Sequence, residues 1–116
     1  YVNAGHETPI LVSEATRKTR EAVQNGPIMG VVEGQDYQSA RLELSPSDVV
    51  LCYTDGVVDT PGDGDRFGYE RLKSVVADAP VIAPEPLMRH VIESVERFGG
   101  GVQTDDQVMV ACRIKS

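Results

Sequence analysis

Acidic side chains gather at the ends of two strand-like segments of the sequence. The continuous apolar run VVLCY (49–53) is followed almost at once by Asp55, and Asp105 and Asp106 stand directly before the alternating run QVMVACRI (107–114). If these two strands pair antiparallel, the end of the first lies beside the start of the second. Asp55 and Asp105 would then converge, and carboxylates held together repel each other unless a cation lies between them. The spacing therefore predicts a cation site at this edge of a sheet.

The residue types in this acidic group indicate which cation it would hold. The group offers carboxylates only, with no His or Cys at ligand spacing, which suits Mg²⁺ or Mn²⁺ better than Zn²⁺. Such ions keep bound water and make it a usable nucleophile near neutral pH. The alternative is that the Asp-Gly after the first strand is a turn and that the acids before the last strand lie in a solvated loop. The matched topology of the two acidic segments favours the cation site.

Charge and composition narrow the class of protein. The chain has 116 residues, enough for one domain with a single core, and its 41% hydrophobic residues are typical of a globular protein. A net charge of −7 argues against binding to nucleic acid or to anionic lipid. The apolar runs are far shorter than the roughly 20 residues that cross a bilayer. Cys52 and Cys112 lie in strand-like runs, so we expect two reduced core thiols and a cytoplasmic protein.

The first quarter of the chain has strand and turn signals. Residues 1–2 and 10–12 flank a Gly/Thr/Pro turn, which is typical of a hairpin. The charged segment 13–23 fits a polar helix capped by Ser13. It fits about as well as a hairpin turn that leads from 10–12 into a strand at 21–23, because it lacks an apolar stripe that would dock a helix. Both alternatives stay open at the level of the sequence.

The rest of the chain has clearer periodicity. Residues 37–44 alternate as a half-buried strand does, and 49–53 are expected to form a central strand. Helical spacing of apolar residues predicts helices over 67–79 and 84–98, the second of which is followed by three glycines. Residues 107–114 alternate again. Strands, then helices, then a returning strand indicate an α+β layered domain.

Five segments, taken in order, resemble the C-terminal portion of the bacterial PPM-type (PP2C-like) serine/threonine phosphatases of the SpoIIE/RsbU group. The resemblance runs from end to end of the chain, and the order of AGH, TDG and DD before a final strand makes it specific. It implies a sandwich of two antiparallel sheets flanked by helices, with a metal pair at one edge. It also implies hydrolysis of phosphoserine or phosphothreonine on a protein by a metal-bridging water. The segments are YVNAGHETPILV, GPIMGVV, LELSPSDVVLCYTDGVVDT, DRFGYERL and TDDQVMVACRI.

The resemblance also implies roles for three acids. Asp55 of TDG and Asp105, the first acid of DD, match metal ligands and are therefore the catalytic candidates. Asp59 falls where related phosphatases place an acid that can hold an additional, weaker metal, and many members of the group have Glu there. The expected cofactor is Mn²⁺ or Mg²⁺, with two metals in the parent protein.

Three more residues are expected close to this site. His6 matches the histidine of the AGH motif, which lies near the same edge in the family, so we expect it near the metals or the substrate. Asp106 is expected to support the ligands without binding the metal itself. Gly56 would allow a close approach of the backbone.

The chain matches only the second part of the family's domain. The family's N-terminal metal motif, of the GDxxGxG kind, is absent from these 116 residues, and the chain begins at once with strand-like sequence at Tyr1. We therefore expect a single truncated domain over 1–116, with weak or absent metal binding and no activity of its own. Such a fragment would expose sheet edges and apolar faces, which dimerisation, strand swapping or the missing part would cover.

Two functions are compatible with the sequence. In the first, the parent is a metal-dependent protein serine/threonine phosphatase of bacterial signalling, and its substrate is a phosphorylated protein such as an anti-sigma-factor antagonist. In the second, the chain is a non-catalytic, phosphatase-like interaction module. The sequence upstream distinguishes them, since an intact GDxxGxG segment favours the enzyme.

Overall fold

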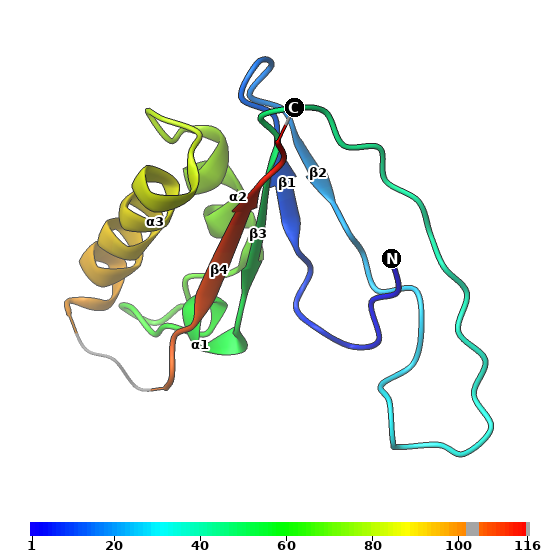
Figure 1. Ribbon diagram of the computed structural model, residues 1–116. Coiled ribbons are helices and arrows are strands. Elements are labelled where there is room, and N and C mark those ends of the chain that lie inside the picture. The colour runs from blue at the N-terminus through cyan, green and yellow to red at the C-terminus, as the bar shows by residue number, and fades with distance from the viewer. Residues whose placement is uncertain (102–104, 116) are drawn as a thin grey trace.

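A four-stranded antiparallel sheet forms the centre of the protein, in a computed structural model that describes residues 1–101 and 105–115. The strand order is β2-β1-β3-β4, so β3 lies inside the sheet, between β1 and β4 (Figure 1). The predicted central strand and the α+β class are both confirmed. The strands are β1 (Ile10–Val12), β2 (Thr19–Glu21), β3 (Val49–Tyr53) and β4 (Met109–Arg113).

The helices lie on one side of this sheet (Figure 1). The short helix α1 (Asp55–Val58) follows β3, and α2 (Tyr69–Ala77) and α3 (Pro84–Gly99) agree with the two predicted helices. Proline suits the first position of α3, where no intrahelical acceptor exists for an N–H, and Gly100 ends the helix with a left-handed φ of 65°. None of the helices in the described part of the chain is long and apolar enough to cross a membrane.

The core lies between the helices and the sheet. Along β3, Val49, Leu51 and Tyr53 are buried on the helical side, whereas Val50 and Cys52 alternate onto the other face. Burying one such apolar side chain contributes about 1.5–3 kcal/mol. The helices and β1 supply the facing apolar side chains. These are Ile10, Val12, Val57, Leu72, Val76, Leu87, Val91 and Val95.

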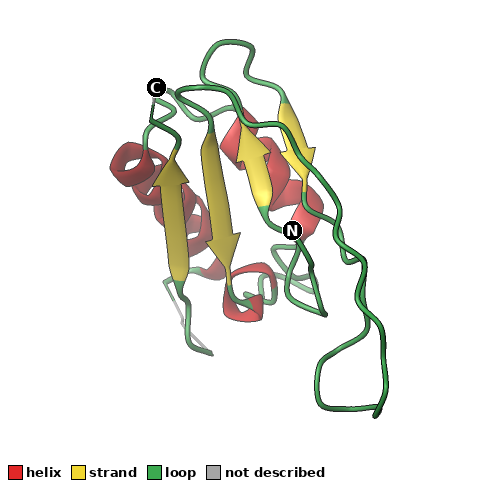
Figure 2. Cartoon of the chain, turned by 45° about the vertical axis from the view of Figure 1, so that its right-hand side comes forward, coloured by secondary structure: helices red, strands yellow, loops and turns green. Residues whose placement is uncertain are grey.

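The face of the sheet opposite the helices is apolar and only partly covered. The long connection between β2 and β3 passes along it (Figure 2). In β4 the residues packed on the core are Met109 and Ala111, so the alternating set that includes Val110 and Cys112 faces away from the helices. Val110 is 53% exposed. Both cysteines are free, Cys52 half-buried and Cys112 exposed, so the prediction of two core thiols is wrong.

Two predicted strands are irregular in the structure. Neither residues 1–2 nor residues 37–44 form a strand. They meet at one point, where the Tyr1 amino group donates to the Ala40 carbonyl at 2.7 Å and the Ala40 N–H donates to the Tyr1 carbonyl at 2.8 Å. A strand needs a partner along its length, and this single reciprocal pair is too short to make a ladder. The hairpin predicted from residues 1–12 therefore lacks its first strand.

The charged segment 13–23 forms a hairpin turn, so the alternative of a helix is wrong. β2 pairs antiparallel with β1 and begins at Thr19, earlier than the strand predicted at 21–23. At the tip, Arg17 takes a positive φ of 59°. Its guanidinium donates to the carbonyls of Ala79 and Pro80, the second at 3.0 Å. These bonds tie the hairpin to the chain that follows α2.

Candidate functional site

Antiparallel pairing of β3 with β4 places the C-terminal end of β3 beside the N-terminal end of β4, so the two acidic segments lie together at this end of the strands, as expected for such a pairing. The register ends with Tyr53 opposite Met109. One bond continues it beyond the strands, from the Thr54 N–H to the Val108 carbonyl at 3.0 Å. Asp55, the next residue of the chain, therefore lies at the same edge as the segment that leads into β4.

Gly56 packs tightly against the second acidic segment. A Cβ atom on this residue would lie 2.9 Å from the carbonyl carbon of Asp106, and closer still to its oxygen. It would also lie 3.6 Å from the carbonyl carbon of Asp105. Any side chain would push the two segments apart. The structure thus brings Asp55-Gly56 against Asp105-Asp106, and space alone requires the glycine.

The buried Tyr53 side chain anchors the end of β3, just before Asp55. Tyr53, the last residue of β3, is buried, and its hydroxyl donates to the Thr8 carbonyl at 2.7 Å. Burial raises the pKa of this phenol well above its ordinary value. Asp55 then opens α1 and is exposed to solvent. The sequence analysis missed α1, although Thr54 followed by an acid is a usual signal for a helix start.

The second acidic segment is a loop that precedes β4. Asp105 and Asp106 are both exposed, and the Asp105 carboxylate accepts the N–H of Asp106 at 2.7 Å. Thr104, which belongs to the quoted motif TDDQVMVACRI, lies outside the described residues.

Asp59 lies one helical turn after Asp55. Its N–H donates to the Asp55 carbonyl at 2.8 Å, which closes α1. The Asp59 carboxylate forms an ion pair with Arg66 at 3.1 Å, and both side chains are largely exposed. The weaker metal ligand expected at this position is therefore engaged by a cation of the chain itself in this structure.

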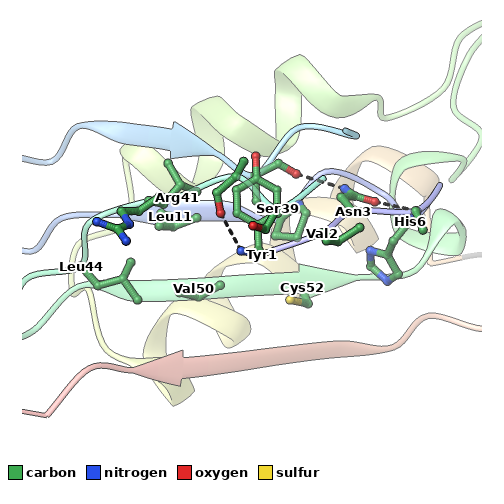
Figure 3. A pocket seen from close by; sticks show the side chains of 15 residues that line it. Tyr1, Val2, Asn3, His6, Leu11, Ser39, Arg41, Leu44, Val50 and Cys52 are labelled. Carbon is green, nitrogen blue, oxygen red and sulfur yellow. Dashed lines mark hydrogen bonds between the residues drawn. The ribbon is translucent and has the colours of Figure 1, made fainter. Parts of the chain in front are cut away.

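His6 lies in a turn close to the end of β3. Figure 3 shows its ring beyond Cys52, in the direction in which β3 runs towards Asp55. The His6 ring is exposed, and Nδ1 is 2.6 Å from the Glu7 carbonyl. The residue also lines a cavity of 860 Å³ between the N-terminal segment, the segment 39–44 and the open face of the sheet.

Asn3 holds the turn that carries His6, and the sequence analysis missed it. Its side chain accepts the His6 N–H at 2.8 Å and donates to the Ala22 carbonyl at 3.0 Å. Its own N–H donates to the Asn25 side chain at 2.7 Å. Asn3 is only 5% exposed, and buried amides are retained where they satisfy backbone groups. The only available signal was a short polar residue just before an Ala-Gly turn.

The donors at this edge fit a hard divalent cation in kind, though not in number. Asp55, Asp105 and Asp106 offer carboxylate oxygens, which Mn²⁺ and Mg²⁺ prefer. No group of three or more His, Cys, Asp or Glu side chains in the described part of the chain is arranged to hold a metal ion. These residues can therefore supply a share of a metal site, and the remaining ligands have to come from elsewhere.

Comparison with known proteins decides the family. The family model "Stage II sporulation protein E (SpoIIE)" matches residues 1–115. The chain belongs to the SpoIIE family. Over 112 residues it is 28% identical to protein IcfG of Synechocystis, and this aligned region makes up 96% of this chain and 18% of IcfG. Over 115 residues it is 18% identical to the phosphoserine phosphatase RsbU of Bacillus subtilis, and this aligned region makes up 99% of this chain and 34% of RsbU.

Solved structures show the same fold for this SpoIIE-family chain. It matches a structure of the PP2C phosphatase domain and a fragment of the regulatory domain of Bacillus subtilis SpoIIE with a TM-score of 0.81 at 18% identity. The match covers 98% of this chain and 34% of that one. The same phosphatase domain has been solved after presoaking with Mn (TM-score 0.73, 18% identity) and in a crystal form without domain swapping (0.76, 17% identity). Each of these two matches covers 97% of this chain and 48% of that one. The SpoIIE-family chain thus spans half or less of each of these relatives.

Proposed function

We propose that the protein containing this chain is a metal-dependent protein serine/threonine phosphatase. The observation that carries the proposal is the contact of Gly56 with Asp106, which sets Asp55 and Asp105 on neighbouring segments at one sheet edge. Membership of the SpoIIE family supports it, as does the likeness to RsbU, a phosphoserine phosphatase. The proposed substrate is a phosphoserine or phosphothreonine on a protein, such as an anti-sigma-factor antagonist in bacterial signalling in the cytoplasm.

In this proposal the residues of the chain divide the work. Asp55 and Asp105 hold Mn²⁺ or Mg²⁺, Asp106 keeps the loop in place, and His6 faces the phosphate from the neighbouring turn. A bound metal pair would neutralise phosphate charge and lower the pKa of the attacking water. Asp59 joins as a weaker ligand only after its ion pair with Arg66 opens. The remaining ligands come from the part of the domain that this chain does not contain.

The experiment uses the full natural protein that contains this chain. Phosphate release from a phosphoserine protein is measured against Mn²⁺ and Mg²⁺ concentration, and then again after removal of metal by a chelator. The proposal predicts release that depends on the metal and is restored when metal is returned. Absence of release at every metal concentration would refute it.

A non-catalytic interaction module is the second candidate, and two observations favour it. The described residues do not group three potential metal ligands, and Arg66 occupies the Asp59 carboxylate. Under this alternative the fold binds a partner protein and the acids remain metal-free. Calorimetry separates the two candidates, because the full protein as an enzyme binds Mn²⁺ and the module does not. The 116-residue chain alone is expected to bind Mn²⁺ weakly or not at all in either case.

The open face of the sheet bears on the assembly of the chain. Val108 and Val110 are each 53% exposed on it, and β4 is an edge strand. Exposed apolar faces and free edges favour association. We propose that the rest of the domain covers this face in the full protein, and that the isolated chain covers it by dimerising or swapping strands. A stable, compact monomer of the isolated chain in size-exclusion chromatography would contradict this proposal.

A further inference from the structure

The Thr54 side chain bridges the two acidic segments. Its hydroxyl donates to the Asp106 carbonyl at 3.1 Å and accepts the Val108 N–H at 3.1 Å. The Thr54 N–H donates to the Val108 carbonyl at 3.0 Å. Three hydrogen bonds from one residue therefore join the end of β3 to the loop that carries Asp105 and Asp106.

The local geometry explains why a hydroxyl is needed at position 54. In an antiparallel ladder, the Val108 N–H would bond to the Thr54 carbonyl. That carbonyl instead accepts the Val57 N–H at 3.1 Å, because the chain turns into α1. The Thr54 hydroxyl takes the place of the lost acceptor. A threonine at a helix N-cap usually accepts an N–H of its own helix, but here the side chain makes no capping bond and serves the neighbouring segment.

A second hydroxyl makes a similar link on the far side of α1. Thr60 is only 3% exposed, and its hydroxyl donates to the Gly56 carbonyl at 3.0 Å. The same hydroxyl accepts the Gln107 side-chain amide at 3.0 Å. Gly56 therefore lies between two threonines whose hydroxyls bond to the second segment, Thr54 before it and Thr60 after it.

We infer that Thr54 is a positioning residue that sets the separation of the Asp55 and Asp105 segments before any metal binds, with Thr60 and Gln107 as support. This inference rests on the proposed phosphatase function. Carboxylates held close together repel each other when no cation is present. Among the described residues, the ladder of backbone hydrogen bonds between β3 and β4 ends at Thr54. A side chain that holds both segments keeps them at binding distance, and preorganised ligands need no rearrangement when the metal arrives. Small displacements of metal ligands at such sites lower the rate of the reaction strongly.

The test compares four variants of the full natural protein. Thr54→Val keeps the shape of the side chain but removes both hydroxyl bonds, whereas Thr54→Ser keeps the hydroxyl. Thr16→Val makes the same chemical change at the exposed tip of the β1–β2 hairpin, where the Thr16 hydroxyl accepts the Lys18 N–H at 3.3 Å, far from the acidic segments in the chain. Gln107→Leu removes the supporting link alone, so a folded variant remains available if Thr54→Val does not fold.

Two readouts are measured for each variant. The first is amide hydrogen exchange at Val108, which reports the bond to the Thr54 hydroxyl without reference to activity. The second is the Mn²⁺ concentration that gives half-maximal phosphate release, measured separately from the maximal rate. For Thr54→Val we expect faster exchange at Val108 and a rise in the required Mn²⁺ of roughly tenfold, as for residues that orient metal ligands. Thr54→Ser should restore both values, Gln107→Leu should shift the Mn²⁺ requirement by less, and Thr16→Val should change neither.

Different results overturn different parts of the account. Unchanged Mn²⁺ dependence in folded Thr54→Val would overturn the positioning role, even if its thermal stability falls. Failure of serine to rescue would overturn the role of the hydroxyl. If the unmodified protein releases no phosphate at any metal concentration, the proposed function fails, and the inference about a metal site fails with it. Val108 exchange would still show whether the hydroxyl bond exists, so the two failures are distinguishable.

Discussion

Substitution of Gly56 by alanine probes the contact between the two acidic segments directly. The new Cβ would lie 2.9 Å from the carbonyl carbon of Asp106, and both atoms of that carbonyl belong to the backbone. Because no flexible side-chain tip can yield and the carbonyl oxygen lies closer still, the Asp106 segment has to retreat by about 1 Å to reach ordinary contact distance. The retreat also stretches the bond from the Thr54 hydroxyl to the Asp106 carbonyl.

Two opposing terms set the size of the stability change. Overpacking of this kind costs about 1–3 kcal/mol. Replacement of glycine by alanine within a helix raises the free energy of unfolding by up to about 1 kcal/mol. The net loss in free energy of unfolding should therefore be small, about 0–2 kcal/mol. Activity should suffer more, because a misplacement of about 1 Å at a reacting centre costs on the order of 100-fold. For a displacement of this size we expect a loss of roughly 100-fold in phosphate release.

The assay pairs urea unfolding with initial rates of phosphate release by the full protein at saturating Mn²⁺. Gly34→Ala is the matched control, since Gly34 has a φ of 75° and nothing within 4 Å of a new Cβ. Strain at that φ destabilises the fold by about 1–2 kcal/mol without touching the acids. Gly34→Ala should therefore keep its activity. If Gly56→Ala retained activity within twofold of the unmodified protein, close apposition of the two segments would not matter for function.

Three other predictions concern groups around the site. Asn3→Ala leaves the Ala22 carbonyl and the His6 N–H without their partner and should lower the free energy of unfolding by about 1–3 kcal/mol in urea titrations, with no change if the network is dispensable. Tyr53→Phe should cost about 1 kcal/mol through loss of its hydrogen bond to the Thr8 carbonyl, and an unchanged free energy of unfolding would contradict this. Burial raises the pKa of the Tyr53 and Tyr69 phenols, so these groups ionise first in the unfolded chain. Their stabilisation is complete below pH 10.0 and falls as pH rises above it, and circular dichroism showing constant stability up to pH 11 would disagree.

Elements with strong local signals were predictable from the sequence. The continuous apolar run at 49–53 became the inner strand, because such a run is typical of a strand covered on both faces, and β3 is buried on the helical face and half-buried on the other. The helices over 67–79 and 84–98 were predicted from apolar spacing. In the structure α2 (Tyr69–Ala77) lies inside the first range, and α3 (Pro84–Gly99) ends one residue beyond the second. The convergence of Asp55 with the second acidic segment was expected on the condition that 49–53 and 107–114 pair antiparallel, and the structure shows that pairing.

Features that depend on distant partners were not predictable in this way. Alternation at 37–44 describes a strand only when another strand lies alongside, and the one reciprocal pair with Tyr1 does not provide it. The alternating apolar set of β4 faces away from the helices, which local periodicity cannot decide. The roles of Asn3 and Thr54 depend on carbonyls and amides 19 to 54 residues away in the chain. Hydrogen bonds of this kind leave no pattern in one sequence.

Asp55→Asn tests the central claim most directly, in the full natural protein. The change keeps the size of the side chain and removes its charge, and Asp55 is exposed, so the fold should keep its stability. If Asp55 binds the metal, Mn²⁺-dependent phosphate release should fall by at least about 100-fold, and calorimetry should show weaker Mn²⁺ binding. A rate and a Mn²⁺ affinity equal to those of the unmodified protein would contradict the assignment of the site.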